Sequence, residues 1–185
     1  MNFWKKLSII CKIKNHITME KVFISGSISI KSLKEDDLAD LVHNQVIKGN
    51  SDIFIGDAYG VDKAVQQILA ERDYRSVIVY FSGEKVRNNV GNWQTKQIPN
   101  PDNLTGRSRY QLKDKAMADD CDYGLMFWDG KSKGNQHNID CLDKLDKKYF
   151  VVCCDKNSPV YKMACLNRKV TGLPMNIWVD LGIKN

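Results

Sequence analysis

GDAYGVDKAVQQIL, residues 56–69, is the stretch that decides the fold, because it joins a short apolar run to an amphipathic pattern. Residues 53–55 before it are apolar at successive positions, which is typical of a strand covered on both faces. After it, apolar residues recur at helical spacing, at Val61, Ala64, Val65, Ile68 and Leu69. A strand, a turn with two glycines and a helix form one unit of a parallel α/β sheet.

The same alternation extends along the chain. β-branched and apolar runs at residues 21–25, 52–55, 76–81, 123–128 and 149–154 predict five strands. Helical patterns follow a Ser32-x-x-Glu35 capping box and recur at residues 61–69, 108–120 and 136–147. We therefore predict an α/β fold, a Rossmann-like three-layer sandwich with a central parallel sheet of about five strands in the order 3-2-1-4-5.

Three segments are expected. Residues 1–18 form a basic N-terminal extension, in preference to a short membrane-touching tail, and the core-forming pattern begins after them. Residues 19–157 form the Rossmann-like domain, and residues 158–185 form a C-terminal arm packed on it. Within the domain, the long segment 82–106 is rich in Asn, Gly and Pro, and loops of this length are usually functional or disordered.

Composition narrows the classes of function. No stretch approaches the roughly 18 uncharged apolar residues of a membrane span. The net charge is +6, but four of the 28 basic residues lie in 1–18, which leaves 24 basic against 22 acidic residues from Met19 onward. That balance of +2 argues against a broad phosphate-binding field, so nucleic acid is not expected as a partner. The six cysteines lack metal-ligand spacing, which predicts a reduced cytoplasmic protein without a metal.

Glycines and small polar residues gather where the strands end. Ser25-Gly26-Ser27 follows the first strand, residues 56–62 follow the second, and residues 129–134 follow the fourth. In an open parallel sheet, ligands bind beyond the carboxyl ends of the strands, where helix N-termini present unpaired N–H groups. We expect a nucleotide-like anion at this edge, with Gly60 letting a phosphate approach the helix N-terminus.

For several side chains near this edge, the sequence leaves two possible roles open. Asp57 either hydrogen-bonds a ribose or makes an Asx turn, and Asp62 either faces the ligand or caps its helix. Arg107 or Arg109 is expected to contact a phosphate, against the alternative of a solvated face. Trp93 either stacks on a base or anchors the long segment. Three further charges are interpreted as surface residues: Lys113, Asp114 and Lys115.

Three stretches together resemble the SLOG superfamily: VFISGS at 22–27, GDAYGVDKAVQQIL at 56–69 and KDKAMADDCDYGLMFWDGKSKGNQHNI at 113–139. This Rossmann-like superfamily includes the LOG phosphoribohydrolases, the DNA-processing protein of transformation, and the small uncharacterised bacterial and phage proteins that the chain resembles most. The resemblance runs from about residue 22 to residue 154.

The resemblance implies a nucleotide pocket at the ends of the first, second and fourth strands. The matching positions are Ser25, Gly26, Ser27, Gly56, Gly60, Asp62, Asp129, Gly130, Ser132 and Gly134. The LOG hydrolases carry PGGxGTxxE in the third loop, whereas this chain has Asn138 where the catalytic glutamate would stand. That difference favours binding over hydrolysis. Possible substitutes for the glutamate are Asp57, Asp129 and Asp140, and Asp129 is the candidate catalytic residue.

We therefore predict a cytoplasmic protein that senses or sequesters a nucleotide or nucleotide-derived small molecule, without a cofactor and as a homo-oligomer. The alternative is an N-glycosidic hydrolase of nucleoside 5′-monophosphates, so whether the protein is an enzyme stays open. A third hypothesis, binding of single-stranded DNA, is opposed by the charge balance of +2.

Overall fold

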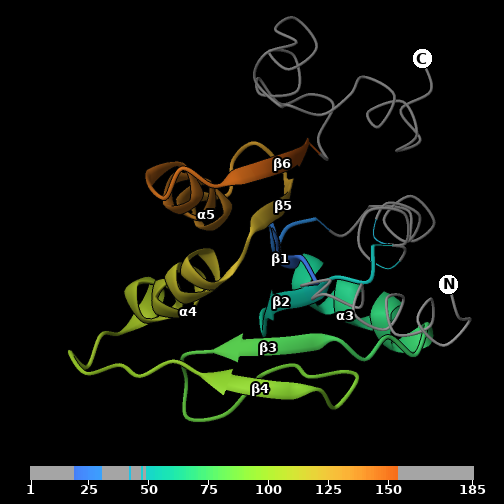
Figure 1. Ribbon diagram of the computed structural model, residues 1–185. Coiled ribbons are helices and arrows are strands. Elements are labelled where there is room, and N and C mark those ends of the chain that lie inside the picture. Colours follow the sequence, from blue (N-terminus) through green and yellow to red (C-terminus); the bar gives the residue numbers. More distant parts are fainter. Residues whose placement is uncertain (1–18, 31–41, 43–46, 48, 154–185) are drawn as a thin grey trace, which may run out of the picture.

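The computed structural model describes residues 19–30, 42, 47 and 49–153, which build a six-stranded parallel sheet flanked by helices (Figure 1). The strand order is β4-β3-β2-β1-β5-β6, and each neighbouring pair is parallel. The strands are β1 (Lys21–Gly26), β2 (Asp52–Gly56), β3 (Val77–Phe81), β4 (Gln94–Gln97), β5 (Tyr123–Trp128) and β6 (Lys148–Cys153).

Helices cover both faces of the sheet, which gives three layers (Figure 1). Helix α3 (Val61–Glu71) packs on one face. Helices α4 (Gly106–Asp120) and α5 (Lys133–Lys144) pack on the other face and contact each other. Because each helix follows a strand and runs back across the sheet, the N-termini of all three helices lie at the carboxyl edge.

Alternation along the strands builds a core on each face. In β1, Val22 and Ile24 point to the face of α3, and Phe23 points to the face of α4 and α5. All three side chains are fully buried, as expected for a central strand covered on both sides. The continuous apolar runs in the sequence therefore reflect two separate cores.

The predicted fold class is confirmed, and the order 3-2-1-4-5 is observed for β1, β2, β3, β5 and β6. The sheet has one more strand than predicted, because β4 pairs with β3 at the edge. Its sequence QTKQ is polar and exposed at all four positions, so it carries no apolar pattern that would predict a strand. The predicted extension (1–18), the C-terminal arm (158–185) and most of the first predicted helix lie outside the described residues.

Two helices begin earlier than their apolar patterns predict. Helix α5 begins at Lys133, because the Ser132 hydroxyl accepts a hydrogen bond from the Asn135 N–H and caps it. Helix α4 begins at Gly106. Among the described residues, no helix is long and apolar enough to cross a membrane.

Candidate functional site

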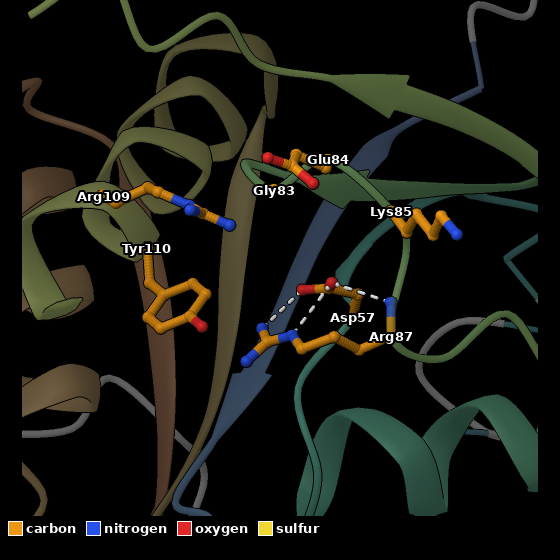
Figure 2. Close-up of a pocket in the computed structure, with 7 residues that line it drawn as sticks. All are labelled: Asp57, Gly83, Glu84, Lys85, Arg87, Arg109 and Tyr110. Carbon is orange, nitrogen blue, oxygen red and sulfur yellow. Dashed lines mark hydrogen bonds and ion pairs between the residues drawn. The ribbon is translucent and has the colours of Figure 1, made fainter. Parts of the chain in front are cut away.

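A pocket of about 360 Å³ opens at the carboxyl edge of the sheet, between the ends of β2 and β3 and the first turn of α4. Figure 2 shows two side chains of α4 projecting toward a pair of charged residues from the strand-end loops. The lining residues are Asp57, Gly83, Glu84, Lys85, Arg87, Arg109 and Tyr110. The segment after β3, which was expected to be a long loop, therefore supplies four of the seven lining residues.

An ion pair between Asp57 and Arg87 forms one wall (Figure 2). The Arg87 Nη2 and Nε donate to the two carboxylate oxygens of Asp57 at 2.6 and 3.0 Å, and the Arg87 N–H donates to Asp57 Oδ2 at 3.1 Å. The Asp57 side chain is 4% exposed and that of Arg87 is 28% exposed. The hydrogen bonds to Asp57 raise the pKa of Arg87 above its ordinary value, although burial works against this. Arg87 is therefore held as a cation at the wall of the pocket.

Two guanidinium groups lie against one aromatic ring. The Arg87 Cζ lies 4.4 Å from the centre of the Tyr110 ring, and the Arg109 Cζ lies 5.9 Å from it. Cations over an aromatic face are attracted by the ring quadrupole. Tyr110 therefore helps to hold two positive groups close together where their mutual repulsion would separate them.

Arg109 has no acceptor for its buried donor. Its Nε is inaccessible to solvent and makes no hydrogen bond with the described residues. Its Nη2 lies beside Gly83, where an added Cβ would be 2.9 Å from it. Buried donors without a partner are rare in folded proteins, because an unmade hydrogen bond costs about 1–3 kcal/mol. A guanidinium kept in this state is suited to an anionic acceptor from outside the chain.

The N-terminus of α4 adds to the positive potential of the pocket. The Thr105 side chain makes no capping hydrogen bond, and the first turn contains no acidic residue. A helix N-terminus without such a cap carries a partial positive charge on its free N–H groups. Helix dipole and guanidinium groups thus favour the same kind of ligand, an anion.

Two buried side chains hold the segment that carries Arg87: Gln66 of α3 and Trp93 of the segment itself. Gln66 is fully buried and donates to the carbonyl oxygen of Gly56 at 2.9 Å, and its own oxygen accepts from the Val90 N–H at 3.0 Å. The Trp93 ring is buried in the core on the α3 face, and its Nε1 donates to the Tyr74 carbonyl at 2.8 Å. Trp93 therefore anchors this segment, which is one of the two roles expected of it, and the other role, stacking on a base, is not supported because Trp93 does not line the pocket.

A buried charged cluster lies next to the floor of the pocket. The Lys113 Nζ donates to Asp114 Oδ1 at 2.5 Å, and both side chains are nearly inaccessible. An added Cβ on Gly56 would lie 2.6 Å from Lys113 Nζ and closer still to the Asp62 carboxylate. The interpretation of Lys113 and Asp114 as surface charges is wrong, because α4 packs this part of its surface against β2 and β3.

Burial dominates the titration of this cluster. Desolvation raises the pKa of Asp62 to about 6, and the nearby Lys113 only partly offsets the effect. Burial works to lower the pKa of Lys113, but the carboxylates of Asp114 and Asp62 outweigh it and raise that pKa. Among the described residues, no group of three or more His, Cys, Asp or Glu is arranged to hold a metal ion.

Asp129 is occupied by hydrogen bonds at the end of β5. It accepts from the Ser29 hydroxyl and from the N–H groups of Lys131 and Ser132, the last two at 2.9 and 2.7 Å. Burial works to raise its pKa, but these hydrogen bonds lower it to about 2. Asp129 is therefore ionised near neutral pH and poorly suited to donate a proton. It also lies outside the pocket.

Asn138, which stands where the LOG hydrolases have their glutamate, is buried behind the first loop. Its Nδ2 donates to the Ser25 Oγ at 2.7 Å, and its Oδ1 has no partner among the described residues. Ser27 donates through its N–H to the Phe127 carbonyl. The first and third loops that the resemblance singled out are thus bonded to each other and to the sheet.

The glycines of the strand-end loops let neighbouring loops pack closely. Gly60 has a φ of 75°, and an added Cβ would lie 2.6 Å from the Ile28 Cα. A Cβ on Gly26 would overlap the Val61 side chain. These contacts explain why glycine occurs at positions where a phosphate cradle was expected.

Of the expected site residues, the structure brings only Asp57 and Arg109 into the pocket. Arg107 is exposed and does not line it. The remaining expected residues, which also lie outside the pocket, are Ser25, Gly26, Ser27, Gly56, Gly60, Asp62, Trp93, Asp129, Gly130, Ser132 and Gly134.

Five lining residues were not expected: Gly83, Glu84, Lys85, Arg87 and Tyr110. Four of them follow β3, at the carboxyl edge where a parallel sheet holds its ligands. Their position after a predicted strand is the feature of the sequence that could have identified them.

Comparison with known proteins gives a likeness in structure. No protein-family model matches the chain, and no curated protein matches it in sequence. The structure matches DNA processing protein A from Helicobacter pylori, described for its single-stranded DNA binding mode, with a TM-score of 0.58 and 18% sequence identity. The match covers 88% of this chain and 79% of the other. The fold is similar to that of a DNA-processing protein.

This likeness to DNA processing protein A agrees with the expected Rossmann-like fold and overturns one expectation. Nucleic acid was not expected as a partner, yet the matched protein binds single-stranded DNA. The expectation failed because net charge averages over the whole chain, whereas Lys85, Arg87 and Arg109 gather at one pocket. The comparison with DNA processing protein A gives no support to a nucleotide-derived small molecule as the partner.

Proposed function

We propose that this protein binds single-stranded DNA and that the pocket at the carboxyl edge holds one of its phosphate groups. The observation that carries the proposal is the Arg109 guanidinium, which has a buried donor and no acceptor within the described chain. The Arg109 Nε is closed off from solvent, so a phosphate oxygen in the pocket would accept from the Nη groups of the same guanidinium. Arg–phosphate hydrogen bonds are among the stronger polar contacts in proteins. The likeness in fold to DNA processing protein A supports the choice of DNA.

The charge of the pocket fits a phosphate. Three cations line it, Lys85, Arg87 and Arg109, against the carboxylates of Asp57 and Glu84. Asp57 is already paired with Arg87, and Arg109 makes no ion pair with the described residues. Most protein–DNA hydrogen bonds go to phosphate and sugar, so one well-formed phosphate site contributes affinity without reading the sequence.

Hydrolysis of nucleoside monophosphates is not favoured by the geometry. Asp129, the candidate catalytic residue, is held in four hydrogen bonds that involve its carboxylate or its N–H, and it is ionised near neutral pH. Glycosidic cleavage usually needs one group that donates a proton to the leaving base. The pocket and Asp129 also lie at different strand ends.

The experiment is fluorescence anisotropy with a labelled oligothymidine of about 16 nucleotides. We expect binding that weakens with salt, and an affinity lower by about ten-fold or more in Arg109→Ala, since a charged hydrogen bond contributes about 1.5–3 kcal/mol. The logarithmic salt slope should fall by about one unit. Arg75→Ala is the matched control, because Arg75 is an exposed arginine that precedes β3 at the opposite edge.

Competition identifies the source of the phosphate. Unlabelled oligothymidine should displace the probe, whereas thymidine monophosphate and duplex DNA should displace it only at far higher concentration. Equal displacement by the monophosphate would instead indicate a free nucleotide as the ligand. Failure of the oligonucleotide to bind, or equal binding by Arg109→Ala and the intact protein, would overturn the proposal.

A further inference from the structure

We propose that Tyr59, together with Ile28, forms a stacking platform for a nucleobase of the strand whose phosphate occupies the pocket. This inference rests on the proposed function and extends the binding site beyond the pocket. Two exposed apolar side chains, one contact between loops and the order of the strands support it.

Tyr59 and Ile28 are the two most exposed large hydrophobic residues of the described chain, at 58% and 60%. They lie close together, because Tyr59 precedes Gly60, whose Cα is packed against the backbone of Ile28. The Tyr59 hydroxyl makes no hydrogen bond with the described residues, and the ring is exposed to a partner. An aromatic ring with an aliphatic neighbour offers a flat apolar surface to a partner.

The platform is continuous with the pocket. Tyr59 follows Asp57, a residue of the pocket wall, by two positions, which places their Cα atoms within roughly 7 Å. Beyond Ile28, the Ser29 hydroxyl donates to Asp129 at the end of β5. Pocket, platform and Asp129 loop thus follow one another across the ends of β3, β2, β1 and β5, which are neighbours in the sheet (Figure 1).

The dimensions of this edge suit a single DNA strand that crosses it. Neighbouring strands lie about 4.8 Å apart, so the ends of β3 and β5 are separated by roughly 14 Å. At the far end, α5 presents its N-terminus and the exposed Lys133. Positive groups therefore occur at both ends of the path, and the apolar platform lies between them. Cations that track the backbone and aromatic rings that receive bases are the common elements of single-strand binding.

The occupant is a base rather than an apolar segment of another protein, because the platform is small and has charged groups on both sides. Two exposed side chains do not supply the apolar area that a stable protein interface needs. A single nucleobase needs no more than one ring to stack on, and its own phosphates pair with the adjacent cations. This arrangement also predicts binding without a strong preference for sequence.

The test compares Tyr59→Ala and Tyr59→Trp on two labelled strands, an oligothymidine and an abasic strand of the same length. We expect Tyr59→Ala to bind the oligothymidine about five-fold or more weakly, and Tyr59→Trp to bind it at least as well as the intact protein. On the abasic strand, which has phosphates but no bases, all three proteins should bind alike. Leu145→Ala is the matched control, since Leu145 is an exposed apolar residue after the C-terminus of α5, at the opposite edge.

The outcomes separate this inference from the proposed function. Binding of the oligothymidine that depends on Arg109 but is unchanged in Tyr59→Ala would overturn the platform and leave the phosphate site intact. An equal loss on both strands would also overturn it, because that result would indicate a distorted loop. Absence of binding by the intact protein would overturn the proposed function itself.

Discussion

Asp62 is a carboxylate that the fold keeps out of water, and the nearby Lys113 only partly offsets the effect of that burial. Burial raises its pKa from 3.8 to about 6, and the charges that face it are Lys113 and Asp114 from α4 and Asp57 from the end of β2. A group whose pKa is higher in the folded than in the unfolded state binds its proton more tightly when folded. Its ionisation therefore costs stability as the pH rises from about 4 to about 6.

We expect Asp62→Asn to be more stable than the intact protein near neutral pH, by up to about 3 kcal/mol, because the amide has no charge to bury. The asparagine oxygen can still accept the hydrogen bond that the Ala58 N–H donates to Asp62 at 3.3 Å. Urea unfolding at several pH values measures the difference between the two proteins. It should increase from about pH 4 to about pH 6 and stay constant above that range. A difference that does not change with pH would show that Asp62 is not the titrating group.

At the level of single residues, only part of the site could be predicted from the sequence. Asp57 and Arg109 were found because each follows a recognisable element boundary at the carboxyl edge. The burial of Lys113 could not be predicted, because a lysine on a helix is normally solvated and only the packing of α4 against the sheet decides otherwise. The sequence left two roles open for Trp93, stacking on a base or anchoring the segment. The hydrogen bond to Tyr74 decides between them, and it is a tertiary contact that no local sequence pattern predicts.

Gly60, at the junction of β2 and α3, has backbone angles of φ 75° and ψ −130°, a region that is open mainly to glycine. We expect Gly60→Ala to destabilise the fold by more than about 2 kcal/mol, since the added Cβ meets the Ile28 backbone and the angles are strained. Gly106→Ala is the matched control, because Gly106 has a φ of 56° and no atom near its added Cβ. Urea unfolding of both variants measures the difference, and equal losses would show that the loop of Ile28 moves aside freely.

The elements themselves were largely predictable. Five strands and the helices α3 and α5 follow from apolar periodicity, because the apolar positions of each run match the faces that become buried. Helix α4 has little apolar periodicity, and its buried residues include Lys113 and Asp114. The exceptions have physical causes. β4 is an exposed polar strand that pairs with β3, and the hydrogen bonds of Gln66 and Trp93 anchor the segment before it. The start of α5 depends on Ser132, a capping signal that lies outside the apolar pattern.

For the whole molecule, deletion of residues 1–18 should leave folding intact. From residue 21 onward the chain already supplies a six-stranded sheet with a core on each face. We expect the shortened chain to melt within about 2 °C of the full chain, a difference that corresponds to less than about 1 kcal/mol for a protein of this size. Thermal unfolding followed by circular dichroism is the measurement. A fall of several degrees, or an insoluble product, would show that the segment packs on the domain.

The placement of β1 at the centre of the sheet has a consequence for the synthesis of the chain. β1 pairs on one side with β2 and on the other with β5, and the hydrogen bond between Lys21 and Asp122 joins residues 101 positions apart. A ribosome adds about 5–20 residues per second, so roughly 5–20 s pass before β5 can emerge. Until then β1, β2 and β3 can assemble only as a partial sheet with an apolar open edge. Slower translation between the codons of β1 and β5 lengthens the interval in which that edge is accessible to other nascent chains.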